Sequence, residues 1–205
     1  MNSVEEIELI KAEIEQYFED PLKGELIHFL STKSKYIRSR IALLYFKSQN
    51  YDINADIIKI LAVGEIIHNA SLLHDDVIDD SDKRRDSAAI RKTFNNNISI
   101  LSGDYLVGYA IEKLLELGNF EILKIFKDCI KSMCKAEIKQ YYLRGQVPEK
   151  EEYFDVCKGK TGSLFSAILK SVAIVLKADI KNSEDFGMLF GLYFQIKNDL
   201  EINSA

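Results

Sequence analysis

The feature that most constrains the fold is an apolar run that leads directly into a cluster of acids. Isoleucine, leucine, valine and alanine fill most of positions 57–67, and Gly64 is the one weak helix former among them. Because this apolar density is too high for a helix with one exposed face, the run predicts a buried helix. Its polar end carries Asp75, Asp76, Asp79 and Asp80. This transition favours the wall of a cavity over an open surface.

The acid cluster suits a metal ion bound together with a phosphate. On a helix, Asp75 and Asp79 stand one turn apart on one face, so their like charges repel. Carboxylates at this spacing suit Mg²⁺, which takes oxygen ligands and commonly bridges to phosphates. The neighbouring Arg84 and Arg85 suit phosphate recognition through their forked donors. A solvated helix end is the competing interpretation. A calcium loop of the EF-hand type is excluded, because its central glycine and closing glutamate are missing.

Composition bounds the class of protein. The 205 residues are enough for one domain with a substantial core, and 47% of them are apolar. Two prolines leave room for long helices and argue against disorder. The formal net charge of −5 argues against a general nucleic-acid binder.

Three further features indicate the cellular compartment. The three cysteines lack CxxC spacing, which fits a reducing cytoplasm and gives no sign of a zinc site. Acids stand at the N-terminus where a signal peptide needs a basic start, so we expect no export. The longest uncharged runs fall short of the about 20 apolar residues that span a bilayer. We therefore expect a soluble cytoplasmic protein without a transmembrane segment.

Apolar spacing predicts helices along the whole chain, and we expect a single all-α domain over 1–205, built as a helical bundle. Asn54 caps the long helix that ends in the acids, and Gly118 with Asn119 separates two later helices. A strand pattern, an internal repeat and a linker are all lacking in the sequence. The expected helices cover about 4–18, 22–30, 41–46, 55–80, 93–116, 119–143, 149–157, 161–177 and 182–202.

Two groups of polar residues have ordinary explanations when each is taken alone. Lys35, Arg38 and Arg40 form a basic set just before an apolar helix, where a solvated helix start is the simpler interpretation. His68 lies two helical turns before the acids, and a lone histidine on an apolar helix is more often a core residue than a ligand.

Two polar clusters occur in the C-terminal third. Gly-Lys-Thr-Gly at 159–162 interrupts the helices and opens the next one, so its backbone donors and Lys160 predict an anion site at a helix N-terminus. A P-loop is excluded, because its first glycine would have to replace Phe154 and no strand precedes it. Gln195 and Asp199 end an apolar helix, where a surface helix end is the simpler interpretation.

Together, the motifs resemble the trans-polyprenyl diphosphate synthase family, which are all-α class I isoprenoid synthases. Their order is Lys-x-x-Arg at 35–38, Leu-Leu-His-Asp-Asp-Val-Ile-Asp at 72–79, Leu-Ser-Gly-Asp at 101–104, the Gly-Lys-Thr-Gly motif and Tyr-Phe-Gln-Ile-Lys-Asn-Asp at 193–199. The resemblance runs from about Lys35 to Asp199. It implies a helical bundle around a central apolar cavity.

The resemblance also implies a reaction and its partners. Members transfer a prenyl group head to tail: an allylic diphosphate leaves as pyrophosphate with the help of Mg²⁺, isopentenyl diphosphate attacks the allylic cation, and a proton is lost. The expected cofactor is Mg²⁺. The expected substrates are isopentenyl diphosphate and an allylic prenyl diphosphate, and we expect a homodimer formed through long helices.

Residue roles carry over by position. Asp75 and Asp76 with Lys160 are the implied catalytic groups, and the implied metal ligands are Asp75, Asp76, Asp79 and Asp199. The implied groups for the allylic substrate are Arg84, Lys160, Thr161 and Gln195, and those for isopentenyl diphosphate are Lys35, Arg38, His68 and Arg85.

Product length is the last property that the resemblance implies. In this family, large residues four and five positions before the first aspartate block the growing chain. Those positions hold Ser71 and Ala70, which are small. We therefore expect a medium-to-long polyprenyl product, unless Phe94, Phe120 or Phe126 closes the tunnel.

Two departures from the family pattern leave other functions open. The second acidic motif reads Asn-Asp-Leu-Glu-Ile at 198–202, so only Asp199 is in place, and Glu201 stands next to the expected last position. The chain ends at Ala205, where the family continues with further helices, so it is expected to be C-terminally shortened. A catalytically weak or silent subunit that binds an active partner is one alternative, and a terpene cyclase is another.

Overall fold

The structure, a computed structural model, describes residues 3–15, 34–80, 83–84, 87–88, 92 and 95–202. Within this part, almost every element is a helix, so the predicted all-α class is confirmed. The described residues form two compact units, Met1–Gly118 and Asn119–Ala205. The single domain over 1–205 and its central cavity stay predictions. The helix expected over 22–30, together with Arg85 and Phe94, lies outside the described residues.

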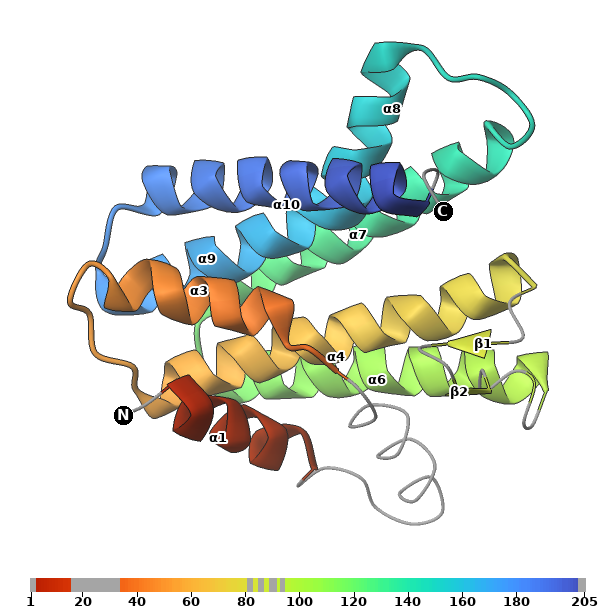
Figure 1. Cartoon of the computed structure of the whole chain (residues 1–205). Coiled ribbons are helices and arrows are strands. Elements are labelled where there is room, and N and C mark those ends of the chain that lie inside the picture. The colour runs from red at the N-terminus through yellow and green to blue at the C-terminus, as the bar shows by residue number, and fades with distance from the viewer. Residues whose placement is uncertain are drawn as a thin grey trace. The chain divides into compact units, whose positions relative to one another are not determined.

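The first unit is organised around one buried helix. Its helices are α1 (Ser3–Glu15), α3 (Ile37–Lys47), α4 (Ala55–Ile78) and α6 (Asn96–Glu116). α4 packs along α6, and α1 and α3 also contact it (Figure 1). The side chains of Ile60, Leu61 and Leu73 on α4 are fully buried. The buried helix predicted from the apolar run is therefore confirmed.

Both ends of α4 lie close to where the sequence predicts them. Asn54 caps the start as expected, because its side-chain oxygen accepts a 3.0 Å hydrogen bond from the Ile57 amide. The helix ends at Ile78, inside the acid cluster as expected and two residues before the expected bound at 80. Asp79 is the C-cap, and Asp80 turns the chain with a left-handed φ of 52°. A short polar residue tolerates this conformation.

The chain after α4 contains two short strands, although the sequence has no strand pattern. Lys83–Arg84 (β1) pairs antiparallel with Ser87–Ala88 (β2), with Arg84 opposite Ser87. Each strand has two residues, too few to give the alternating pattern from which a strand is predicted.

The second unit contains α7 (Phe120–Tyr142), α8 (Lys150–Cys157), η1 (Lys158–Gly162), α9 (Ser163–Leu176) and α10 (Ile180–Ile202). α9 packs along α10 and also contacts α7 (Figure 1). The fully buried Phe165 on α9 lies 5.2 Å and 5.9 Å, between ring centroids, from Phe190 and Phe194 of α10. This aromatic cluster fixes α10 against α9.

Helix starts in the second unit follow local capping rules. At the predicted break between two helices, Asn119 caps α7 through hydrogen bonds from the Glu121 and Ile122 amides. The start predicted at 182–183 for the last helix is wrong, because Asp179 accepts a 2.9 Å bond from the Asn182 amide and α10 begins at Ile180. Aspartate is as good a cap as serine or asparagine, so the sequence offered two starts.

The predicted interruption at 158–162 is also wrong. These five residues form one turn of π-helix that joins α8 to α9 without a break. Lys160 and Thr161 therefore lie inside a continuous helical segment, where the backbone amides serve the helix itself. The helix N-terminus on which the predicted anion site depended is therefore not formed here.

Two helical stretches among the described residues, Ala55–Ile78 and Lys150–Leu176, are long and apolar enough to cross a membrane. In their most apolar windows, 78% and 61% of the residues are buried inside the fold. Length and composition are thus weak evidence for a membrane span, because the core helices of a soluble protein pass the same test.

Candidate functional site

The basic set around α3 divides into residues with different surroundings. Lys35 is exposed, whereas Arg38 is 9% exposed and lies in the first turn of α3. The guanidinium Nε of Arg40 donates a 2.9 Å hydrogen bond to the Lys35 carbonyl. Arg40 therefore stabilises the backbone before α3.

The acids at the end of α4 stand in an electrostatically costly place. Asp76 is fully buried and Asp75 is half-buried, whereas Asp79 is exposed. The last turn of α4 carries no basic residue, so the negative end of the helix dipole adds to the repulsion among the carboxylates. A bound cation relieves both effects. The donor chemistry of this helix end therefore fits Mg²⁺.

These carboxylates suit a cation that is bound by the protein and by a ligand together. Among the described residues, no group of three or more His, Cys, Asp or Glu side chains is arranged to hold a metal ion. Mg²⁺ commonly takes one or two carboxylates together with substrate phosphates and water. Asp75 and Asp76 are suitable for the protein's share of such a site. The family role of Asp79 stays a prediction.

α6 supports this end of α4 through a close approach. A Cβ on Gly103 would lie 2.4 Å from the His74 Nε2, so a larger residue there would displace the ring. His74 Nε2 lies 3.2 Å from an Asp104 carboxylate oxygen, and Ser99 Oγ donates a 2.9 Å bond to the Leu73 carbonyl. The turn that carries the acids is therefore held from the side.

The remaining predicted residues of the first unit lie along α4 and in β1. His68 is half-buried, Ala70 is buried, and Ser71 donates a 2.7 Å hydrogen bond to the His68 carbonyl. Arg84 lies in β1. The tunnel role of Ala70 and Ser71 stays a prediction.

The two phenylalanines proposed to close the tunnel lie in the second unit. Phe120 is 79% exposed and Phe126 is fully buried.

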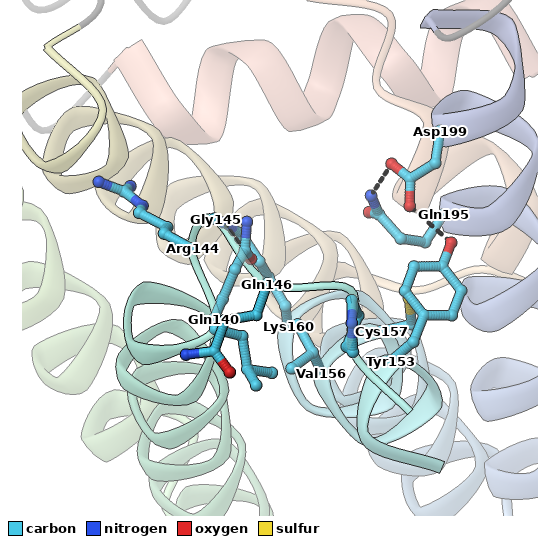
Figure 2. Close-up of a pocket in the computed structure, with 12 residues that line it drawn as sticks. Gln140, Arg144, Gly145, Gln146, Tyr153, Val156, Cys157, Lys160, Gln195 and Asp199 are labelled. Atoms are coloured by element: carbon cyan, nitrogen blue, oxygen red, sulfur yellow. Dashed lines mark hydrogen bonds between the residues drawn. The ribbon is translucent and has the colours of Figure 1, made fainter. Parts of the chain in front are cut away.

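The second unit contains a cavity of about 320 Å³. It is lined by the end of α7, the turn after it, α8, η1 and α10. Its polar lining includes Gln140, Arg144, Tyr153, Lys160, Gln195 and Asp199 (Figure 2). Lys160, from one sequence motif, thus lines the same cavity as Gln195 and Asp199, which belong to another.

Lys160 is held by α7. Its ammonium forms an ion pair with Glu137 and donates a 3.3 Å hydrogen bond to the Gln140 side-chain oxygen. The side chains of Lys160 and Glu137 are 25% and 12% exposed, so solvent screens this pair only partly. The cation is therefore fixed at the cavity edge, where it can meet an anionic ligand.

A chain of hydrogen bonds runs from η1 through α10 to α8. Thr161 Oγ1 donates to the Gln195 oxygen at 2.7 Å, and Gln195 Nε2 donates to Asp199 Oδ1 at 2.8 Å. The Tyr153 hydroxyl donates to Asp199 Oδ2 at 2.7 Å (Figure 2). Burial and the bond to Asp199 raise the pKa of the Tyr153 phenol, so it remains a donor at neutral pH. Both oxygens of Asp199 are therefore oriented.

Close helix packing makes this hydrogen-bond chain possible. A Cβ on Gly191 would lie 2.7 Å from the Gly162 Cα, so the backbones of α10 and η1 touch at a pair of glycines. Thr161 precedes one glycine directly, and Gln195 lies one turn after the other. The short approach therefore sets the Thr161–Gln195 distance.

Glu201 does not take the place of the missing second acid. Its side chain is 65% exposed and lies 3.6 Å from the Lys197 ammonium, one turn earlier on α10. A residue two positions after Asp199 points to another face of the helix. Asp199 therefore stands without a second acid of the motif.

Sequence reasoning missed three side chains that hold a predicted site residue or its neighbour: Glu65, Glu137 and Tyr153. Glu65 had a usable signal, because a lone acid inside an apolar helix is rarely buried unless it has a partner. Glu137 and Tyr153 lie on amphipathic helices among other polar residues, which gives no such contrast.

Comparison with known proteins agrees with the motifs. The family model described as "Polyprenyl synthetase" matches residues 19–201. A decaprenyl-diphosphate synthase of Dictyostelium discoideum is 35% identical over 176 residues, which cover 84% of this chain. An octaprenyl diphosphate synthase of Escherichia coli (strain K12) is 33% identical over 178 residues, also 84% of this chain. A crystal structure of a decaprenyl diphosphate synthase from Rhodobacter capsulatus matches 96% of this chain with a TM-score of 0.89 and 26% identity.

The matches cover much less of the relatives than of this chain. They span 38% of the Dictyostelium protein, 54% of the Escherichia coli protein and 63% of the Rhodobacter chain. The family model nonetheless covers most of the sequence, in both units. The chain therefore belongs to the polyprenyl synthetase family.

Proposed function

We propose that this protein is a prenyltransferase that condenses isopentenyl diphosphate with an allylic prenyl diphosphate. The observation that carries the proposal is that Lys160, Gln195 and Asp199 line one cavity. A fixed cation beside an oriented carboxylate suits a diphosphate that shares a metal ion with the protein. Family membership supports the same reaction, because the relatives are named decaprenyl, octaprenyl and heptaprenyl diphosphate synthases.

In the proposed reaction, the bond between the allylic carbon and the diphosphate oxygen breaks, and pyrophosphate leaves with the electron pair. The double bond of isopentenyl diphosphate attacks the allylic carbon, and the elongated chain then loses a proton. Bound Mg²⁺ supplies positive charge that stabilises the departing pyrophosphate. Asp75, Asp76 and Asp79 would hold this cation in the first unit, and Asp199 is the corresponding group in the second.

The chain's own residues have three tasks in this scheme. Lys160 and Thr161 with Gln195, together with Arg84, bind the allylic diphosphate. Lys35, Arg38, His68 and Arg85 bind isopentenyl diphosphate. The apolar side chains of α4 exclude water from the allylic cation, which water would otherwise quench.

We propose a medium-to-long polyprenyl product. The small Ala70 and Ser71 precede the first aspartate by about one turn of α4, and Ala70 is buried. A small side chain there leaves room for a growing chain. The named product lengths of the relatives support this range.

A catalytically silent binding subunit is the second candidate. It is favoured by the second acidic motif, because Asp199 lacks a second acid and Glu201 pairs with Lys197 instead. In this case the protein would bind diphosphates through Lys160 and serve an active partner.

We also propose a cytoplasmic homodimer. α6 exposes Leu101, Tyr105, Ile111 and Leu115 at spacings that place them near one face. An exposed apolar face on a long helix is suited to a second copy. Sedimentation velocity on the full chain tests this assembly, and a monomer at micromolar concentration would contradict it.

The test of function is incorporation of labelled isopentenyl diphosphate, with farnesyl or geranylgeranyl diphosphate as primer and Mg²⁺ present. The control is the double variant Asp75→Ala/Asp76→Ala. We expect elongated products that disappear in the control, with lengths that test the role of Ala70 and Ser71.

The alternatives give different results in the same assay. A silent subunit binds diphosphate in the presence of Mg²⁺ but forms no product. A terpene cyclase consumes the allylic diphosphate and releases a hydrocarbon without incorporating label.

A further inference from the structure

We propose that Glu65 is a positioning residue that fixes the N-terminus of α3 and thereby orients Lys35 and Arg38 for a diphosphate. The inference rests on the proposed function, because it assumes that these two residues bind isopentenyl diphosphate. Glu65 itself lies in α4 and is 1% exposed, so it acts through α3 and does not reach solvent.

The start of α3 lacks a cap of its own. Its N-cap residue, Tyr36, makes no side-chain capping bond and has left-handed backbone angles, φ 49° and ψ 39°. A bulky residue in this conformation is strained, because its Cβ approaches the following carbonyl oxygen. Such a start persists only when neighbouring groups hold it.

Glu65 supplies the missing cap from another helix. One carboxyl oxygen, Oε1, accepts the Ser39 backbone amide at 3.1 Å and the Ser39 hydroxyl at 2.8 Å. Ser39 is three residues after the N-cap, where capping side chains normally accept an amide. Because Ser39 is fully buried, this amide has no access to water if Glu65 is removed.

The contact between Glu65 and Ser39, called the clamp below, also positions the two basic residues. Arg38 directly precedes Ser39, and Lys35 directly precedes the strained Tyr36. Arg40 holds the Lys35 carbonyl at 2.9 Å, so the backbone is tied on both sides of Arg38. At the other end of α3, Lys47 reaches both carboxyl oxygens of Glu6 at 3.0 Å. The helix is therefore fixed at two points, and the Glu65 contact is the one next to the basic pair.

A matched pair of variants tests the clamp. Glu65→Gln keeps an oxygen of the same reach that accepts both Ser39 donors, whereas Glu65→Met keeps the shape and removes the acceptor. Ser39→Ala removes only the hydroxyl donor and serves if Glu65→Met does not fold. Lys35→Ala is the control for the proposed function, because it deletes a basic group and leaves the Glu65–Ser39 contact in place.

Two measurements on the full chain test the positioning role of Glu65. Hydrogen–deuterium exchange of the peptide that spans 34–44 reports the clamp without any ligand. Calorimetric titration with isopentenyl diphosphate reports its effect on binding. We expect Glu65→Met to speed exchange in this peptide and to raise the Kd about tenfold, the scale of losing one helix cap. Glu65→Gln should stay within about twofold of wild type, and Ser39→Ala should raise the Kd about two- to threefold.

Three outcomes overturn the inference in distinguishable ways. Unchanged exchange in Glu65→Met shows that the clamp is not formed. Faster exchange with an unchanged Kd shows a contact that serves stability alone. If Glu65→Gln loses as much affinity as Glu65→Met, the charge matters and the hydrogen-bond geometry does not. By contrast, wild-type protein that fails to bind, or Lys35→Ala that binds like wild type, refutes the proposed role of the basic pair, and the positioning role falls with it.

Discussion

The contact between Gly191 and Gly162 makes a quantitative prediction about the second unit. A helical glycine replaced by alanine normally gains about 1 kcal/mol of helix stability. At Gly191 the new Cβ would lie 2.7 Å from the Gly162 Cα and 3.0 Å from a ring carbon of Phe165. The first of these atoms is backbone, so relief requires that α10 move away from η1.

The gain in helix stability and the cost of the close contact can be compared directly. Overpacking of this kind costs about 1–3 kcal/mol, and the backbone contact argues for the upper end. We therefore expect Gly191→Ala to lower the free energy of unfolding by about 1–2 kcal/mol after the helix gain is subtracted. Gly108 on α6 is the control, because a Cβ there meets nothing within 4 Å. Gly108→Ala should raise the free energy of unfolding by up to about 1 kcal/mol.

Urea unfolding followed by circular dichroism measures both changes. A Gly191→Ala protein as stable as Gly108→Ala would refute the packing argument. The variant also has a consequence for the site: movement of α10 lengthens the 2.7 Å bond between Thr161 and Gln195. We expect weaker binding of pyrophosphate with Mg²⁺, measured by calorimetry, in Gly191→Ala and not in Gly108→Ala.

Three further predictions concern the same unit. Tyr153→Phe removes a hydrogen bond to Asp199 and should weaken Mg²⁺-dependent pyrophosphate binding severalfold by calorimetry, whereas Tyr193→Phe, on an exposed tyrosine of α10, should not. Lys160→Met should lower pyrophosphate affinity about tenfold or more at low salt. Lys170→Met, which breaks an ion pair with Glu184, should leave the affinity unchanged. Equal losses of affinity in the two variants would contradict the cavity as the anion site. One thiol, the exposed Cys134, should react with a thiol reagent in the folded protein, while the buried Cys129 and Cys157 react only on unfolding. Because partial burial raises the pKa of Cys134, its labelling rate should continue to climb above pH 9.0, its ordinary value.

The core of the fold could be predicted because the signal was local. The apolar run at 57–67 has one interpretation, a buried helix, and α4 confirms it. Asn54 caps its helix as expected, and the expected break at Gly118 and Asn119 is followed by a helix that Asn119 caps, since a capping side chain acts within three residues of itself. The acids at the end of α4 were identified for the same reason, as a contrast between neighbouring residues.

The contacts of the candidate site could not be predicted from any short stretch of the sequence. Glu65 caps a helix that begins 28 residues earlier, and Tyr153 holds a carboxylate 46 residues later. A capping box or motif search examines neighbours in sequence, so it cannot find either contact. The lone acid in the apolar run is the one trace that such a contact leaves.

The error at 158–162 shows why glycine is an ambiguous signal. Two glycines in five residues normally end a helix, and the sequence was interpreted that way. Here a Cβ on Gly159 would lie 2.7 Å from the Ala136 Cβ, and one on Gly162 would lie 2.6 Å from the Met188 sulfur. Both glycines let neighbouring helices approach, and the helix passes through them as a π-turn. The widened turn is also what places Lys160 beside Glu137 and Thr161 beside Gln195, so the packing requirement and the polar site have one structural cause.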